Sequence, residues 1–437
     1  MRLEPFRQPV LLVHRSPFLV VLRHLDDAHH GRKVTGKHAA RPRFRPGNRP
    51  GPDDEEEHTM SSTLPNALDQ PLLRRADLGD FLLPNRVVMA PVTRGRAAND
   101  GLVPTQLHAA YYGQRATAGL IITEGTWVSE RAIGFVNVPG IYREEQVAGW
   151  RRVTDVVHAL GGRIVLQLWH TGAASHPDHL GGELPGGPSA INPHTRCFTA
   201  GGFKESVTPR EMTTADITAT VADFRAASAH ARRAGFDGVE IGALGSFLIP
   251  QFLNPRLNHR TDAYGGDRTG RRRLLLEIFD AVALPWSGRR VGVRLGPYWT
   301  EGDRFRADEE TLADYDALVR ELNDRPVAYL HLRGRDRIAA AGTPDFAAIA
   351  RYRRQFDGPL IANNGFDRAS GNAVIDAGIA DAVSFATHFI ANPDLVTRFA
   401  LHREPAVGDP ATYYAGGADG YVDYPMSGME ASLLERR

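Results

Sequence analysis

From residue 85 onward, short apolar runs alternate with longer stretches in which apolar residues recur every three or four positions. Runs of the first kind are typical of buried strands, and the second periodicity is typical of amphipathic helices. The strands that we expect cover residues 86–92, 120–128, 163–170, 238–243, 290–296, 327–332, 359–365 and 381–387. The clearest helices are expected at residues 214–235, 271–284 and 310–322, with Gly235 ending the first of them.

Continuous apolar strands flanked by helices predict a parallel sheet that is covered on both faces. About eight strand–helix units is the number that closes a (β/α)8 barrel, so we predict a single TIM barrel of the α/β class. An open doubly wound sheet is the alternative, although no G-x-G-x-x-G motif follows the first strand. Residues 171–209, rich in Gly, Pro, His and Ser, interrupt the pattern after the third strand. We expect them to form a capping lid, with a disordered insertion as the alternative.

Residues 1–59 differ from the rest of the chain, with many Arg, His and Pro residues and an acidic run from Asp53 to Glu57. Helical and strand periodicity are weak there, which indicates either a disordered extension or a start assigned too far upstream, with Met60 as the true start. A functional basic arm is the minor alternative. We therefore expect an N-terminal extension over residues 1–59 and the barrel over residues 60–437.

Composition adds limits on partners and location. The chain has 437 residues, 42% of them hydrophobic, and a formal net charge of +1, which gives no reason to expect nucleic acid or an anionic membrane as a partner. No apolar run approaches the roughly 18 residues of a membrane span. The one cysteine, Cys197, excludes an intramolecular disulfide and favours a reducing compartment. We expect a cytoplasmic monomer or homodimer that acts on a small molecule and binds no metal.

In a TIM barrel, the functional groups lie at the C-terminal ends of the strands. At the first strand end, Pro91 stiffens the turn and Thr93 offers a hydroxyl group. The third strand supplies Gln167, whose amide can donate and accept hydrogen bonds at once. Arg294 lies in an otherwise apolar fifth strand and needs an anionic partner, either a barrel carboxylate or a ligand, because an unpaired buried guanidinium is too costly.

The stretch from Gly235 to Gly266, GFDGVEIGALGSFLIPQFLNPRLNHRTDAYGG, resembles the signature segment of the old yellow enzyme family, the FMN-dependent ene-reductases. MAPVTR at residues 89–94, EGT at 124–126, QLWH at 167–170 and TYYAGGADGYVDYP at 412–425 are also similar to family segments. The resemblance extends over residues 85–425. It implies an FMN-binding barrel with NADPH or NADH as the reductant.

The resemblance also implies a set of cofactor contacts. These are Ala90, Pro91, Thr93, Ala118, Gly125, Gln167, Arg294, Asn364, Gly365, Ala386 and Thr387. Thr93 would lie near the N5/O4 edge of the flavin, Gln167 at its pyrimidine edge, and Arg294 at its N1/O2 locus. In the family, an Arg that grips the phosphate usually stands where this chain has Thr387. The phosphate contact must therefore be rebuilt, with Thr387, His388 or backbone donors as candidates.

The substrate-activating residues of the family are missing. Where the family usually carries a His and an Asn that hold a substrate carbonyl, this chain has Gly242 and Gly245, and Phe247 stands in place of the proton-donating Tyr. Loss of one preorganised donor typically costs ~10²–10³ in rate, so reduction of ordinary enones should be impaired. The residues that we expect to contact the substrate instead are Tyr414, Trp169 and Tyr298, followed by Trp127 and His176.

Three functions remain open at this point. The preferred one is NAD(P)H-linked hydride transfer through flavin N5 to the activated alkene of a bulky small molecule, with Gly242 and Gly245 widening the pocket. The second is a flavin-dependent dehydrogenase or oxidase, in which carbonyl polarisation matters less. The third is a protein that binds flavin without turnover, which the retained ring contacts disfavour.

Overall fold

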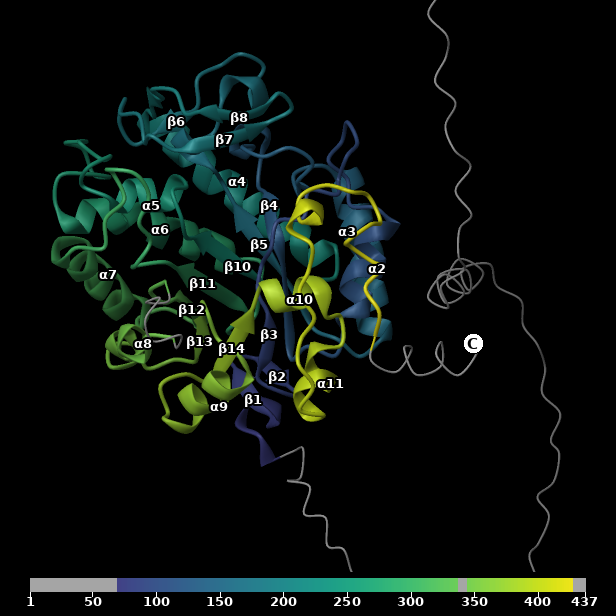
Figure 1. Cartoon of the computed structure of the whole chain (residues 1–437). Coiled ribbons are helices and arrows are strands. Elements are labelled where there is room, and N and C mark those ends of the chain that lie inside the picture. Colours follow the sequence, from purple (N-terminus) through teal and green to yellow (C-terminus); the bar gives the residue numbers. More distant parts are fainter. Residues whose placement is uncertain (1–68, 337–343, 427–437) are drawn as a thin grey trace, which may run out of the picture. The chain divides into compact units, whose positions relative to one another are not determined.

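The computed structural model describes residues 69–336 and 344–426. Within them, eight parallel strands close into a barrel in the order β10-β11-β12-β13-β14-β3-β4-β5, and helices surround it (Figure 1). The predicted TIM barrel is confirmed, and the open doubly wound sheet is excluded. The expectations for residues 1–59 and for Met60 lie outside the described residues.

All eight predicted strands form the barrel wall. They are β3 (Val87–Met89), β4 (Leu120–Trp127), β5 (Ile164–Trp169), β10 (Gly238–Ala243), β11 (Val291–Leu295), β12 (Val327–Arg333), β13 (Leu360–Asn363) and β14 (Ala382–Phe385). β3 differs most from its predicted range and ends before Pro91, which has no N–H to donate to the neighbouring strand. Every residue of these strands is buried except Arg333.

The outer helices follow the strands in alternation. They are α2 (Gln106–Gln114), α3 (Glu144–Ala159), α4 (Thr214–Arg233), α6 (Arg268–Ala283), α7 (Glu309–Leu322), α8 (Phe346–Arg353), α9 (Arg368–Asp376) and α11 (Leu395–Ala400), with two short helices, α5 (Leu248–Leu253) and α10 (Thr387–Ala391), near strand ends. The three predicted helices correspond to α4, α6 and α7. Gly235 follows α4 with a φ of 88°, a left-handed conformation that glycine adopts without strain.

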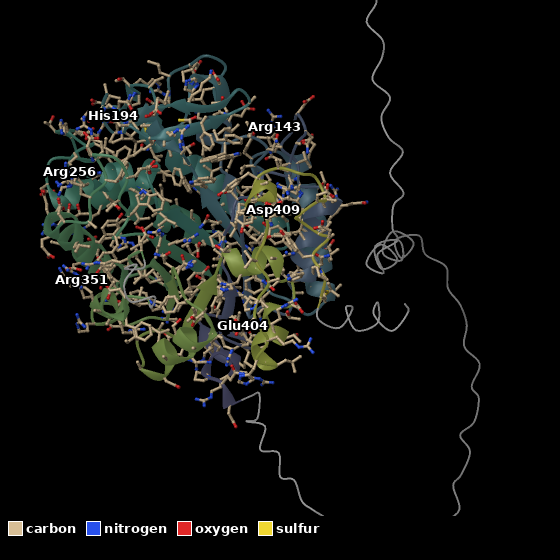
Figure 2. All side chains as sticks on the ribbon, viewed as in Figure 1. Arg143, His194, Arg256, Arg351, Glu404 and Asp409 are labelled. Atoms are coloured by element: carbon tan, nitrogen blue, oxygen red, sulfur yellow. The ribbon has the colours of Figure 1, made fainter. Side chains whose placement is uncertain are left out.

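Charged side chains cover the outside of the helical ring (Figure 2). Arg256, in the loop after α5, pairs with Asp308, and Arg351 of α8 pairs with Asp316 at 2.7 Å. No helix among the described residues is both long and apolar enough to cross a membrane.

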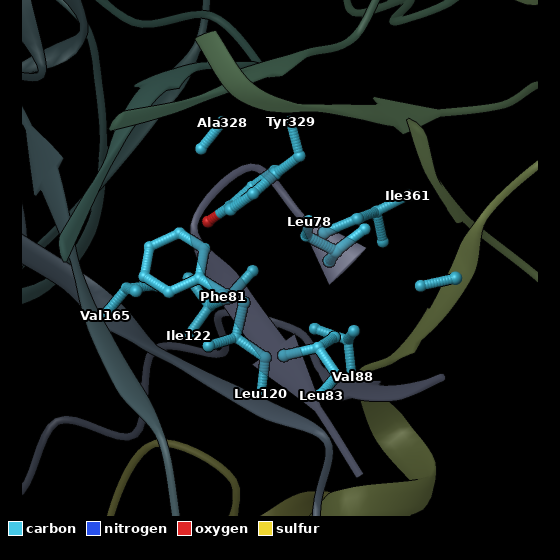
Figure 3. Close-up of a cluster of buried hydrophobic side chains, with 11 residues drawn as sticks. Leu78, Phe81, Leu83, Val88, Leu120, Ile122, Val165, Ala328, Tyr329 and Ile361 are labelled. Carbon is cyan, nitrogen blue, oxygen red and sulfur yellow. The ribbon is translucent and has the colours of Figure 1, made fainter. Parts of the chain in front are cut away.

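A two-stranded hairpin closes the N-terminal end of the barrel, and the sequence patterns did not predict it. β1 (Ala76–Leu78) pairs antiparallel with β2 (Phe81–Leu83), and their apolar side chains join a cluster that fills the barrel floor (Figure 3). Phe81 packs against Tyr329 of β12 with ring centroids 6.3 Å apart. This plug leaves only the opposite end of the barrel open to a ligand.

The segment between β5 and α4 forms a second hairpin above the other end (Figure 1). β7 (Arg196–Thr199) pairs antiparallel with β8 (Gly202–Glu205), while the short strands β6 (Gly186–Gly187) and β9 (Arg210–Glu211) pair parallel with each other in a separate two-stranded sheet. Cys197 of β7 is buried, and its thiol donates to the carbonyl oxygen of Ala174 at 3.0 Å. Burial raises the pKa of the thiol to about 11, so Cys197 has a packing role.

Candidate functional site

A cavity of about 850 Å³ lies at the C-terminal ends of the barrel strands, where TIM-barrel enzymes bind their ligands. Every barrel strand, or the turn that follows it, contributes to the lining. The predicted cofactor contacts that line it are Pro91, Thr93, Gly125, Gln167, Arg294, Asn364, Gly365, Ala386 and Thr387. The fold therefore brings together nine residues that are far apart in sequence.

Ala90 and Ala118 do not line this cavity. Both are buried, at 0% and 1% exposure, and their backbone N–H groups donate to the carbonyl oxygens of Phe385 and Arg115. The structure thus places these two predicted contacts behind the cavity wall rather than on its surface.

A buried polar chain crosses the floor of the cavity. Gln167 donates from Nε2 to Glu240 Oε1 at 2.7 Å, and Glu240 Oε2 accepts from His331 Nδ1 at 2.9 Å. His331 Nε2 lies 2.8 Å from Ser384 Oγ. Burial lowers the pKa of His331, which keeps the ring neutral. The bond to Glu240 fixes which end of the Gln167 amide donates, and it leaves the amide oxygen as an acceptor.

Arg294 has no salt bridge that would neutralise it among the described residues. It donates from Nη2 to Asn363 Oδ1 at 3.2 Å, and its buried Nε has no hydrogen-bond partner within the described part of the chain. Burial lowers its pKa to about 10, and Glu240 opposes this shift. The guanidinium is therefore charged at neutral pH, and its unpaired edge lies beside the cavity. Since the described residues provide no salt bridge to Arg294, a bound ligand is the one of the two predicted partners that can complete its contacts.

Aromatic rings line another part of the cavity. Trp169 stacks on Trp127 at a centroid distance of 4.6 Å and on Phe135 at 5.4 Å, while Phe247 meets its edge at 4.7 Å. A Cβ added at Gly125 would lie 2.3 Å from the Trp169 ring. The packing of Trp169 therefore requires a glycine at position 125.

The two glycines in place of the family's His and Asn occupy different surroundings. Gly242 lines the cavity, and so do Leu244 and Phe247. Gly245 does not line it, and its φ of 77° turns the chain so that an added Cβ would lie 3.0 Å from the Phe247 ring. The expectation that both glycines widen the pocket stays a prediction, and the position in the cavity lining supports it for Gly242 and not for Gly245.

Of the three predicted substrate contacts, Tyr414 and Trp169 line the cavity and Tyr298 does not. Tyr298 lies three residues beyond the end of β11, and its hydroxyl donates to the carbonyl oxygen of Ala348 at 3.3 Å. It lines a separate surface cavity with Arg335. The structure therefore does not bring Tyr298 together with Tyr414 and Trp169, and a catalytic role for it stays a prediction.

The two secondary candidates also lie away from the cavity. Trp127 is fully buried behind Trp169. His176 accepts from the backbone N–H of Asp178 at 3.1 Å. His170, expected to have a packing role, accepts from the backbone N–H of Gly172 at 2.9 Å, and burial lowers its pKa to about 3.

Two buried arginines hold the C-terminal segment that carries Tyr414. Arg94 donates to the carbonyl oxygens of Tyr413 and Gly420, and Arg96 donates to that of Thr412 at 2.7 Å. Tyr414 itself is 57% exposed at the cavity mouth. The MAPVTR turn thus fixes the position of a segment more than 300 residues away.

The sequence interpretation missed several lining residues. Arg333 ends β12, Trp299 lies in the loop after β11, and Phe198 and Phe203 belong to the β7–β8 hairpin. Only Arg333 carried a usable signal, since it directly follows the apolar run VAYLHL. The positions of the aromatic residues depend on loop conformations that periodicity does not predict.

A closed barrel whose strand ends direct a threonine, a glutamine amide and an unpaired arginine toward one cavity is the arrangement expected of a flavin-dependent barrel oxidoreductase. Residues 71–405 match the NADH:flavin oxidoreductase / NADH oxidase family, and the chain belongs to this family.

Relatives of known structure or assigned name agree with this membership. The chain is 39% identical over 369 residues to 12-oxophytodienoate reductase 1 of Oryza sativa subsp. japonica, covering 82% of this chain and 93% of that protein. Morphinone reductase superposes with a TM-score of 0.77 at 42% identity, covering 82% and 96% of the two chains. The old yellow enzyme homologue from Zymomonas mobilis gives a TM-score of 0.75 at 35% identity, covering 81% and 99%.

The chain is therefore an old yellow enzyme-type oxidoreductase that uses FMN with NADH or NADPH as reductant. Its residues fit this cofactor. The unpaired Nε of Arg294 offers a donor to an electron-rich ring edge, and the Gln167 amide, held by Glu240, offers an acceptor.

Proposed function

We propose that this enzyme reduces the activated alkene of a bulky, largely apolar small molecule, with a substrate activation that differs from the family pattern. The observation that carries the proposal is the cavity itself. Its volume of about 850 Å³ holds both FMN and substrate, and its substrate side presents Gly242 and Phe247 where the family places polar groups, together with the apolar Leu244. When bound, FMN supplies hydride transfer from the nicotinamide to the substrate.

Arg294 and Gln167 act on the cofactor side of the cavity. The Arg294 guanidinium provides a fixed positive charge that stabilises negative charge on a bound ring, and low water access strengthens this effect. Glu240 holds the Gln167 amide in one orientation. Gln167 and Arg294 are preorganised, because Glu240 accepts a hydrogen bond from the first and Asn363 accepts one from the second.

The aromatic wall binds the substrate and excludes water. Phe135, Trp169 and Phe247 form one packed group, and Phe198 and Phe203 of the hairpin line the same cavity. Burial of apolar substrate surface contributes ~25 cal/mol per Å², so a polycyclic molecule gains more from this wall than a single small ring does. Residues 171–209 act as the cap in this proposal.

Tyr414 is the group that we assign to proton delivery. It lines the cavity, and its exposure lets solvent return a proton to Oη after each turnover. Tyr414→Phe should slow substrate reduction by roughly 10²-fold or more and leave flavin reduction by NADPH unchanged. Equal rates of substrate reduction in Tyr414→Phe and the wild type would remove Tyr414 from this role.

An anaerobic two-step experiment tests the function. NADPH or NADH should bleach the bound flavin, and a panel of oxidants should then restore its colour. We expect polycyclic enones to reoxidise it faster than cyclohexenone. Faster reoxidation by cyclohexenone would contradict the proposal. Flavin reduction by a saturated substrate in place of NAD(P)H would indicate a dehydrogenase or oxidase, and no flavin reduction at all would indicate a binding protein.

A further inference from the structure

The cavity contains a second arginine that the family pattern does not explain. Arg333, the last residue of β12, lines the cavity together with Arg294 of the neighbouring strand. Its Nη1 is buried and has no hydrogen-bond partner among the described residues. Arg333 is also the one residue of the barrel strands that is not fully buried.

Two contacts hold the Arg333 side chain in place. Its guanidinium lies 4.9 Å from the centre of the Trp299 ring, and Nη2 pairs with Asp336. The side chain is only 16% exposed. These contacts fix the plane of the guanidinium and leave Nη1 as a preoriented donor.

Both arginines of the cavity keep a buried donor atom for a further acceptor. Arg294 and Arg333 are close enough that the charge of Arg333 helps to lower the pKa of Arg294, after the larger effect of burial. Asp367 is the one carboxylate among the lining residues that the structure describes, and it also caps α9 by accepting from the Ser370 N–H. Beside the pair with Asp336, Arg333 keeps Nη1 without a partner among the described residues, and Arg294 keeps Nε, so each can donate to a bound anion.

Arg333 lies beside the strand ends that hold phosphate in TIM barrels, those of the seventh and eighth strands. It is in register with Asn363 of β13, and Asn364 Nδ2 donates to the carbonyl oxygen of Arg335 at 2.8 Å. Asn364, Gly365 and Thr387 line the same cavity. At the position of Thr387, the family usually has the arginine that grips the phosphate.

We propose that Arg333 binds the phosphate of FMN and replaces the missing arginine from a different strand. In this arrangement the arginine that contacts the phosphate stands at the end of β12, whereas in the family it stands at the start of α10. The backbone groups of the turns after β13 and β14 contact the phosphate in both arrangements. The proposal rests on FMN as the cofactor and does not depend on the identity of the substrate.

Titration with two flavins tests this proposal. FMN and riboflavin share the ring and the ribityl chain, and only FMN carries the phosphate. The full chain, freed of flavin, is titrated with each while quenching of flavin fluorescence is recorded. Arg333→Gln should weaken FMN binding by about 10- to 100-fold, the usual value of a charge-assisted contact, and leave riboflavin binding nearly unchanged.

Arg335→Gln is the matched control. Arg335 lies two residues further along, packs over Tyr298 at 4.8 Å and does not line the cavity, so its loss should change neither titration. Equal losses of FMN and riboflavin affinity in Arg333→Gln would overturn the proposal, because Arg333 would then act on the ring or on folding. Unchanged FMN affinity would also overturn it and would indicate that Arg333 binds an anionic group of the substrate instead.

A second variant tests the exchange of positions. Thr387→Arg, added to Arg333→Gln, returns an arginine to the family's position and should regain most of the lost FMN affinity. No recovery, with an unchanged circular dichroism spectrum, would count against the proposal. None of these measurements involves an alkene or turnover, so failure here and failure of the proposed substrate are distinguishable.

Discussion

Gly242 is the residue at which the loss of substrate activation is tested most directly. It lines the cavity, its φ is not positive, and an added Cβ would lie 3.1 Å from the Leu168 carbonyl oxygen. We expect Gly242→His to fold and to raise kcat/KM for cyclohexenone by roughly 10²-fold, since one preorganised donor typically contributes ~10²–10³. The reoxidation rate of the reduced enzyme by cyclohexenone measures the effect.

Gly242→Phe is the control for this change, because it fills similar space without a hydrogen-bond donor. If both variants reduce cyclohexenone equally well, the gain comes from cavity volume, and the interpretation of Gly242 as a lost polarising group is contradicted. The bulky substrates should bind more weakly to both variants, since each adds a side chain to the cavity.

Gly245 and Tyr298 show why the site could be predicted only in part. The sequence places both near strand ends, but that position alone does not decide cavity lining: Gly245, two residues after β10, does not line the cavity, whereas Thr93, four residues after β3, does. The φ of 77° at Gly245 and the outward turn before Tyr298 are loop geometries that no periodic pattern encodes. Gln167 and Arg294 lie within strands, and both line the cavity.

At the scale of elements, the β7–β8 hairpin contributes two aromatic residues to the cavity lining. Phe203 of β8 lines the cavity although it is 61% exposed, and it packs against Phe198 with ring centroids 4.9 Å apart. An exposed aromatic ring of this kind contributes little to folding and is available to a ligand.

Phe203→Ala should therefore affect binding more than stability. We expect KM for a polycyclic enone to rise about 5- to 10-fold, because roughly half an aromatic side chain of apolar burial is lost, and KM for cyclohexenone to stay nearly constant. Steady-state kinetics with both substrates measures the difference. Lys204→Ala, at the neighbouring exposed position that pairs with Asp178, is the matched control. A similar KM increase for both substrates in Phe203→Ala would contradict the capping role.

At the scale of the whole molecule, the barrel was predictable because each strand is a continuous apolar run buried on both faces. The β1–β2 plug was not, since its strands have three residues each and carry no periodic signal. Its contribution comes from long-range packing of Leu78 and Phe81 against the starts of barrel strands. Short elements of this kind depend on the fold that they complete.

Glu124 joins four parts of the molecule at one buried point. It lies in β4, its Oε2 accepts from the Arg94 N–H at 3.2 Å, and its Oε1 is 3.5 Å from the Tyr112 hydroxyl of α2. Arg94 in turn holds the C-terminal segment. Burial raises the pKa of Glu124 to about 7, and the contacts with Arg94 oppose that shift only in part.

This pKa predicts how the contribution of Glu124 to stability depends on pH. The folded state holds the Glu124 proton more tightly than the unfolded state, so this contribution should fall as the pH rises from about 4.5 to about 7 and then level off. The total loss is roughly 3 kcal/mol, at ~1.4 kcal/mol for each pKa unit.

Glu124→Gln cannot ionise and should lack this loss, so its free energy of unfolding relative to the wild type should rise across the window. Urea unfolding at saturating FMN, repeated from pH 4.5 to pH 8, measures the difference. Glu130→Gln, which removes a solvent-exposed carboxylate, should give a nearly constant difference. A constant difference for Glu124→Gln as well would mean that the buried carboxylate is already compensated by Arg94.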